Sequence, residues 1–127
     1  MSRSTPSTPP PTRDRYHHGD LRRSLLQAGR QILADQGVDA LTLREVARRA
    51  QVSQAAPYHH FNGKAELVSA IAQHGFEDFA AALRAGAAAT GGGALQRLTG
   101  MGLAYVRFAA ANPNLFRLLF RPELRRP

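Results

Sequence analysis

The sequence contains no cysteine. Disulfides, thiolate metal sites and a cysteine nucleophile are therefore excluded. No apolar stretch approaches the roughly 20 residues that a membrane-spanning helix needs, and the amino terminus lacks the apolar core of a signal peptide. Residues 65–83 also lack the Lys and Arg that an amphipathic membrane helix carries. These absences favour a cytoplasmic protein with no membrane partner.

Acidic residues are scarce, with nine Asp and Glu against 17 Lys and Arg, and the formal charge is +8. Residues 1–64 hold ten basic and five acidic residues, and residues 65–127 hold seven and four. The positive surplus favours an anionic partner, but because it is spread along the chain it also fits a protein that is simply kept soluble. The length of 127 residues fits one domain, or a small domain with part of a second.

The residue types needed for catalysis and cofactor binding do not occur in the required arrangements. Ser53 with a histidine and Asp20 has neither a nucleophile elbow nor an oxyanion loop around it. The three glycines at 91–93 lack the Lys-Ser/Thr ending of a phosphate-binding loop. Two pairs of adjacent histidines have no third ligand at metal-binding spacing. The sequence therefore predicts no enzyme, no cofactor and no metal site.

A short helix is predicted over residues 43–50. Thr42 followed by Glu45 matches a capping box, in which each side chain binds a free backbone N–H of the first turn. The apolar residues recur at three- and four-residue steps and form one stripe, while Arg44 falls outside it. One face should therefore pack, and the other should meet water or phosphate.

A second short helix is predicted from Ser53, as its N-cap, toward residue 61. Pro57 lies in its first turn, where the missing N–H strains the helix without abolishing it. Small residues at its start would let it lie deep in the major groove, with Gln54 and His59 reaching base edges. Two helices joined by a tight turn predict a helix-turn-helix, although helical hairpins are also common in other small helical proteins.

The run LTLREVARRAQVSQAAPYHHFNGKAELV resembles the DNA-binding domain of the TetR/AcrR family of bacterial transcriptional regulators. The shared features are a Thr at the start of the family's second helix, a Val-Ser turn, a Tyr-x-His-Phe ending of the recognition helix and a Lys opening the fourth helix. The resemblance implies phosphate contacts from Thr42, Tyr58, His60 and Lys64, and base contacts from Gln54, Ala55 and His59. The full predicted DNA-binding set is Thr42, Arg44, Ser53, Gln54, Ala55, Tyr58, His59, His60 and Lys64.

Two positions depart from the family pattern. Gln51 stands where the family often has glycine, which predicts a cost of about 1 kcal/mol if the backbone there is left-handed. Gly63 stands where a capping side chain often precedes Lys64, which predicts a looser start to the helix that follows.

The rest of the chain predicts an all-α protein in three parts. Residues 1–18 read as a disordered basic tail, whose arginines fit an arm for the DNA minor groove or a solvated leader without a role. Residues 19–63 read as the three-helix DNA-binding head, in which Asp20 caps a helix over 21–36 that Gly37 ends. Residues 64–127 read as a linking helix and a partial regulatory domain.

In this third part, a long helix is predicted from about 64 to 84, then a flexible break over 85–93, a helix over 94–111 and a short helix over 114–120. The inner side of the long helix is predicted to be Leu67, Val68, Ile71, Phe76, Phe79 and Leu83. The residues that could line an effector cavity are Phe76, Phe79, Tyr105 and Phe108, although stripes at helical spacing are more often ordinary core.

Taken together, these features predict a sequence-specific DNA-binding regulator. The resemblance implies a repressor that binds palindromic double-stranded DNA as a homodimer and is released by a small-molecule effector. It also implies that the second domain is only about half present, so that the chain is truncated or its apolar surface meets a partner. The alternatives are a helical protein-interaction module and a truncated regulator without effective operator binding.

Overall fold

The computed structural model describes the backbone of residues 13–121 and the side chains of residues 19–121. The helices are α1 Arg13–Gln36, α2 Leu43–Ala50, α3 Lys64–Ala88, α4 Ala94–Ala111 and α5 Pro113–Leu119, with two short 3₁₀ helices, η1 Val38–Ala40 and η2 Ala56–His59. The described part of the chain contains no strand, so the all-α prediction is confirmed. None of its helices combines the length and apolar composition needed to cross a bilayer.

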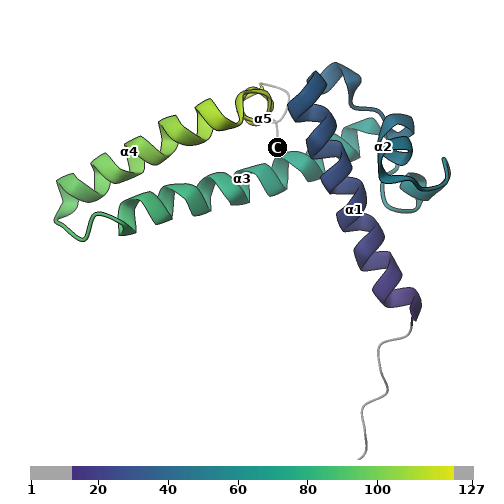
Figure 1. The fold of residues 1–127 in the computed structure, drawn as a ribbon, viewed down its shortest axis with the longest axis horizontal. Helices are drawn as coiled ribbons and strands as arrows, with labels where there is room; N and C mark the ends of the chain where they lie inside the picture. Colours follow the sequence, from purple (N-terminus) through teal and green to yellow (C-terminus); the bar gives the residue numbers. More distant parts are fainter. Residues whose placement is uncertain (1–12, 122–127) are drawn as a thin grey trace, which may run out of the picture.

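The helices form a head and an arm (Figure 1). In the head, α1 packs against both α2 and α3, and α2 contacts the turn with η2, which lies at the outer edge. The arm consists of the rest of α3 and the antiparallel α4, which lie side by side. From the end of α4 the chain turns back, and α5 lies against both α1 and α3. The long α3 thus connects the outer edge of the head to the far end of the arm.

The first helix is longer than its sequence predicts. It begins at Arg13, eight residues before the predicted start at Leu21, so Asp20 lies inside the helix and is not its N-cap. Residues 13–20 contain no proline, and a helix can extend past a residue that is able to cap it. The prediction of a disordered tail is thus wrong for 13–18, and for 1–12 it lies outside the described residues. Gly37 ends the helix as predicted, with φ 86°.

The core runs from the head into α5. The apolar stripe of α1 faces this core, with Leu25 and Ile32 fully buried. These residues pack with side chains from α2, α3 and the segment between them, and Leu118 and Leu119 of α5 belong to the same cluster. The members with less than 2% exposure are Leu25, Ile32, Leu33, Leu41, Val46, Phe61, Leu67, Ile71, Leu118 and Leu119. The leucines of α5 therefore help to stabilise the head.

The arm depends on a close approach between two helix backbones. A Cβ added at Gly86 of α3 would lie 2.5 Å from the carbonyl oxygen of Gly100 of α4 and 2.6 Å from Cβ of Ala104. Only residues without a side chain allow such contact. The flexible break predicted for 85–93 is therefore wrong in its first half, because α3 continues to Ala88 and uses Gly86 for packing. The turn is confined to 89–93, where Gly91 has φ 58°.

The corner between α4 and α5 fixes the last helix to the head. Asn112 is the C-cap of α4 and the N-cap of α5, and Pro113 opens α5 with a ring that suits a first helical position. The Asn114 Nδ2 group donates to the carbonyl oxygens of Leu33 at 3.0 Å and Ala34 at 3.1 Å. These carbonyls lie in the last turn of α1, where the Leu33 oxygen also accepts the Gly37 N–H at 3.0 Å. Asn114 thus ties α5 to the end of α1.

Candidate nucleic-acid interface

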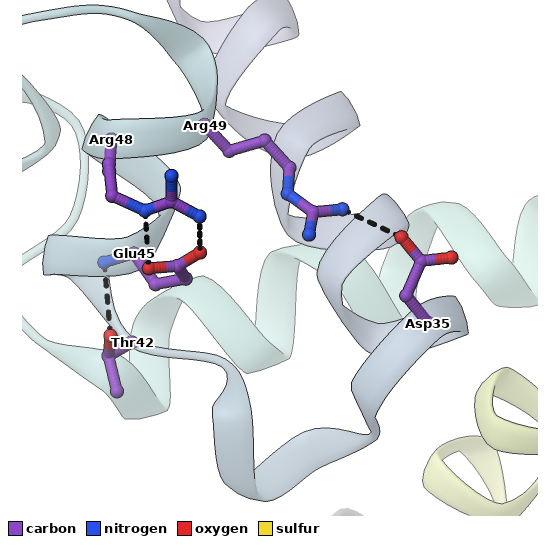
Figure 2. A network of polar contacts seen from close by, with 5 residues as sticks. All are labelled: Asp35, Thr42, Glu45, Arg48 and Arg49. Atoms are coloured by element: carbon purple, nitrogen blue, oxygen red, sulfur yellow. Dashed lines mark hydrogen bonds and ion pairs between the residues drawn. The ribbon is translucent and has the colours of Figure 1, made fainter.

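The start of α2 is fixed by a side-chain cap. The Thr42 Oγ1 atom accepts a hydrogen bond from the Glu45 N–H at 3.1 Å, which confirms half of the predicted capping box. The Glu45 carboxylate binds the Arg48 guanidinium, whose Nε donates at 2.9 Å (Figure 2). This hydrogen bond is the main reason that the pKa of Glu45 is lowered and that of Arg48 is raised. The Thr42 hydroxyl keeps its own proton, which it can donate to a phosphate oxygen.

The arginines of α2 differ in their partners. Arg48 binds Glu45 within the helix, and Arg49 binds the Asp35 carboxylate of α1 at 2.8 Å (Figure 2). Arg44 lies outside this network and is exposed. The pairing leaves Arg44 as the arginine of α2 best placed for an anionic partner.

The turn after α2 has a left-handed residue at Gln51, which is the condition under which the sequence predicted a cost at this position. Gln51 has φ 59° and ψ 43°. Its N–H bonds to the carbonyl of Arg48 at 3.2 Å, while the Val52 N–H bonds to the carbonyl of Ala47 at 3.1 Å. This pair of hydrogen bonds is the Schellman motif, which usually has glycine at the left-handed position. The motif sets the direction in which the chain leaves α2.

The predicted recognition helix is shorter and tighter than expected. Ser53 was predicted to cap an α-helix, but the regular turn is a 3₁₀ helix with Ala55 at its N-cap. The physical reason is Pro57, which has no N–H to donate to the Ser53 carbonyl four residues earlier. That carbonyl accepts instead from Ala56 at 3.1 Å, which closes a three-residue turn.

This short helix has a buried side and an exposed side. Ala56 and Pro57 are buried against the head. Gln54 and His59 are exposed, and Tyr58 is 61% exposed. The residues predicted to meet bases and phosphates therefore point outward, while the proline anchors the turn.

The other predicted contact residues surround this turn. Thr42, Ser53, Ala55 and Lys64 are exposed, whereas His60 is half-buried, with its ring centroid 6.4 Å from that of Phe61. Eight of the nine predicted residues are thus exposed, and all nine lie on α2, on η2, beside these two elements or at the start of α3. Their contacts with DNA stay predictions.

Lys64 opens α3 without a side-chain cap. Gly63 has extended backbone and makes no capping hydrogen bond, in line with the looser start predicted. The Glu66 carboxylate compensates in part, because it accepts the N–H of Asn62 at 2.9 Å. Because Lys64 is the first residue of α3, its ammonium group lies at the amino end of a helix, where free N–H groups also favour an anion.

Sequence reasoning did not identify Arg22. Its guanidinium carbon lies 4.9 Å from the ring centroid of Phe61, and Nη1 donates to the His60 carbonyl at 3.4 Å. The partners are 38 positions apart, so no local pattern could have shown the contact.

The four residues predicted to line an effector cavity meet in an aromatic cluster. The Phe79 ring centroid lies 5.4 Å from that of Tyr105 and 5.1 Å from that of Phe108. Phe76 was placed on the inner side of its helix, but it is 42% exposed and contacts the edge of the cluster through Phe120 at 6.4 Å. The rings pack against one another, and their role in ligand binding stays a prediction.

Across the side chains of residues 19–121, no three His, Asp or Glu residues lie close enough together to hold a metal ion.

Comparison with known proteins decides the family. Residues 25–71, which include α2, η2 and the start of α3, match the family model of bacterial regulatory proteins, tetR family. The chain belongs to the TetR family. TetR-family relatives include the HTH-type transcriptional activator FasR of Mycolicibacterium smegmatis, 30% identical over 110 residues that cover 87% of this chain and 50% of FasR.

Two further matches agree with this assignment. The HTH-type transcriptional repressor KstR2 of Rhodococcus jostii is 35% identical over 71 residues, which cover 56% of this chain and 34% of KstR2. The solved structure of a protein with unknown function from Rhodococcus sp. RHA1 superposes with a TM-score of 0.74 at 42% identity, covering 83% of this chain and 54% of that protein. This TetR-family chain therefore spans about half, or less, of the length of these three proteins.

Proposed function

We propose that this chain is a sequence-specific DNA-binding transcriptional regulator. The observation that supports this most strongly is the outward display of Gln54, Tyr58 and His59 on a turn whose other side, Ala56 and Pro57, is buried. A buried anchor fixes the turn, and the exposed side chains are free to meet the grooves of a duplex. The family membership gives this surface its expected partner, double-stranded DNA.

Each exposed group has a chemistry suited to its assigned contact. The Gln54 amide can donate and accept toward adenine in the major groove, and the His59 ring nitrogens can hydrogen-bond a base edge. The small side chain of Ala55 lets the backbone approach the bases closely. We assign phosphate contacts to the Tyr58 hydroxyl and to the Lys64 ammonium group.

Further phosphate contacts come from around the turn. Thr42 and Ser53 offer hydroxyl protons, and Arg44 offers a guanidinium group that is not engaged in the network of Figure 2. His60 is assigned a phosphate contact by resemblance, and its half-buried ring restricts it to a contact at the rim.

The second half of the proposal concerns regulation. We propose that two copies bind a palindromic operator in the bacterial cytoplasm and that a small effector in the arm releases them. The arm supports this because α3 begins at Lys64, at the DNA edge, and reaches the aromatic cluster at Phe79 after about 22 Å, at 1.5 Å per residue. The named relatives include one activator and one repressor, and we propose repression for this chain.

The decisive experiment starts with selection of bound sequences from a random DNA pool, followed by fluorescence anisotropy. Gln54→Ala and His59→Ala should each reduce the preference for the selected sequence by roughly 1–3 kcal/mol. Lys64→Ala should weaken binding to all sequences alike and lower the salt slope by about one. Arg84→Ala, on an exposed part of α3 in the arm, is the matched control for loss of one charge.

If all of these variants bound the selected sequence as tightly as the wild type, the recognition assignment would be wrong. Effector binding needs a separate test, in which thermal unfolding is followed across a library of small molecules. A lack of any stabilising compound would contradict the effector half of the proposal.

A helical protein-interaction module is the second candidate function. Its support is the exposed apolar face of α4, where Leu95 is 75%, Leu98 65% and Val106 63% exposed. Such faces often meet a partner. DNA selection separates the two candidates, because an interaction module would enrich no sequence. Sedimentation would separate a dimeric regulator from a truncated one that binds DNA weakly as a monomer.

A further inference from the structure

The recognition turn is the segment 53–61, which contains η2. Arg22 joins α1 to the end of this turn. It precedes residues 25–71, which match the family model, and it is absent from the predicted DNA contacts. Its guanidinium group lies over the ring of Phe61, 4.9 Å from the centroid, and donates to the His60 carbonyl at 3.4 Å. Both partners directly follow η2.

The recognition turn has little regular structure of its own to hold it. It contains a single 3₁₀ helix of four residues, and Pro57 removes one backbone donor. Its last hydrogen bonds run from the N–H groups of His60, at 3.0 Å, and Phe61, at 2.9 Å, to the Pro57 carbonyl. Because short helices are marginal in isolation, the position of the turn depends on what anchors its two ends.

The two ends are anchored differently. The leading end leaves α2 through the hydrogen-bonded turn at Gln51. The trailing end is anchored by Phe61, which is 1% exposed, and by the contacts of Arg22. A contact at this point bears on the orientation of Tyr58 and His59, because they are the residues directly before it.

We infer that Arg22 is a positioning residue for DNA reading, which clamps the trailing end of the recognition turn through the Phe61 ring and the His60 carbonyl. This inference rests on the proposed function. Arginine suits the task because its planar group can stack on a ring while its N–H groups donate at the edge. Lysine keeps the charge but cannot reproduce both contacts.

The rival explanation is that Arg22 binds a DNA phosphate directly. Arg23 provides the matched control, since it is exposed on the same turn of α1 and lines the same shallow hollow between α1 and α3. Losing either arginine removes one positive charge from almost the same place. A difference between the two variants therefore reports the contacts with Phe61 and His60.

The first experiment measures backbone hydrogen exchange of the full chain without DNA. Arg22→Gln and Arg22→Lys should speed exchange at the N–H groups of His60 and Phe61 by about three- to tenfold, as expected for loss of a stacked, charge-assisted contact. Arg23→Gln should leave these rates unchanged, and exchange in α4 should be the same in all variants. Equal rates in Arg22→Gln and Arg23→Gln would overturn the clamp.

The second experiment measures binding of the selected DNA at several salt concentrations. Both Arg22 variants should weaken binding by about three- to tenfold with an unchanged salt slope, because fewer molecules hold a competent turn. Wild-type affinity in Arg22→Lys, together with a slope lowered by about one in Arg22→Gln, would identify a phosphate ligand and overturn positioning. If the wild type selected no DNA, the proposed function would fail, while the exchange rates would still decide whether Arg22 holds the turn.

Discussion

Replacing Gln51 with glycine should stabilise this protein, although the substitution removes a side chain. Gln51 has φ 59° and ψ 43° at the turn after α2. A residue with a Cβ loses roughly 1–2 kcal/mol in this conformation because Cβ approaches the following carbonyl. Glycine avoids that cost, but its greater freedom in the unfolded chain takes back roughly 0.4–1 kcal/mol. The expected gain in the free energy of unfolding is therefore about 0.5–1 kcal/mol.

Urea denaturation followed by circular dichroism can resolve a gain of this size. With a slope of about 2 kcal/mol per molar urea, the midpoint should rise by roughly 0.3–0.5 M while the slope stays the same. Gln51→Ala is the control, because alanine also has a Cβ and keeps the left-handed cost. Since the Gln51 side chain is exposed, this variant should remain within about 0.5 kcal/mol of the wild type.

The comparison of the two variants decides the argument. If Gln51→Gly were no more stable than Gln51→Ala, the left-handed backbone would not be the source of strain. If both were equally destabilised, the glutamine side chain would be making a favourable contact, and the reasoning from backbone geometry would be refuted.

Three further predictions concern packing, the corner and pH. Gly100→Ala should lower the free energy of unfolding by roughly 1–3 kcal/mol, because the added Cβ would collide with the facing backbone of α3. Gly102→Ala, with open space around it, should raise it by roughly 0.5–1 kcal/mol. Equal effects in thermal unfolding would contradict the close approach of the two helices. Asn114→Ala should lower the free energy of unfolding by roughly 1–2 kcal/mol in urea titrations through loss of its two hydrogen bonds to α1, and an unchanged midpoint would show that α5 is held without them. Glu45→Gln should destabilise slightly at neutral pH. The hydrogen bond from Arg48 lowers the pKa of Glu45 in the folded state, so the stabilisation from the Glu45 charge is present above the unfolded-state pKa and is lost as pH falls through the folded-state pKa. If the stability difference between Glu45→Gln and the wild type persisted in acid, the charge of Glu45 would not be its source.

The parts of the fold that could be predicted from sequence are those decided by local chemistry. The bounds of α2 follow from the Thr42 cap and the apolar stripe, and α4 spans the predicted residues 94–111 because glycines precede it and Asn112-Pro113 follows it. The all-α class and the buried stripe of α1 follow from helical periodicity in the same way.

The differences arise where two local signals compete or where tertiary contacts decide. Pro57 was expected to strain an α-helix, but the loss of its N–H favours a 3₁₀ turn. Gly86 was expected to break the chain, but contact with Gly100 stabilises a continuous helix. Asp20 can cap a helix, yet α1 extends through it.

The candidate interface shows the same division. The exposed residues of the recognition turn could be named from sequence, because the motif carries several fixed spacings. The clamp from Arg22 to Phe61 could not, because it joins residues far apart in the chain that meet only after folding. The bond from Asn114 to the end of α1 spans 81 positions and was equally hidden.

The burial of Leu118 and Leu119 against the head bears on how this protein can be re-engineered. A chimaeric regulator could be designed by joining the DNA-binding head to a foreign sensor at the point where α3 begins. That junction would remove Leu118 and Leu119 of α5 from the head and expose to water the apolar core against which they pack. A successful exchange would have to carry α5, or a sensor helix with equivalent leucines, together with α1, α2 and the first turns of α3.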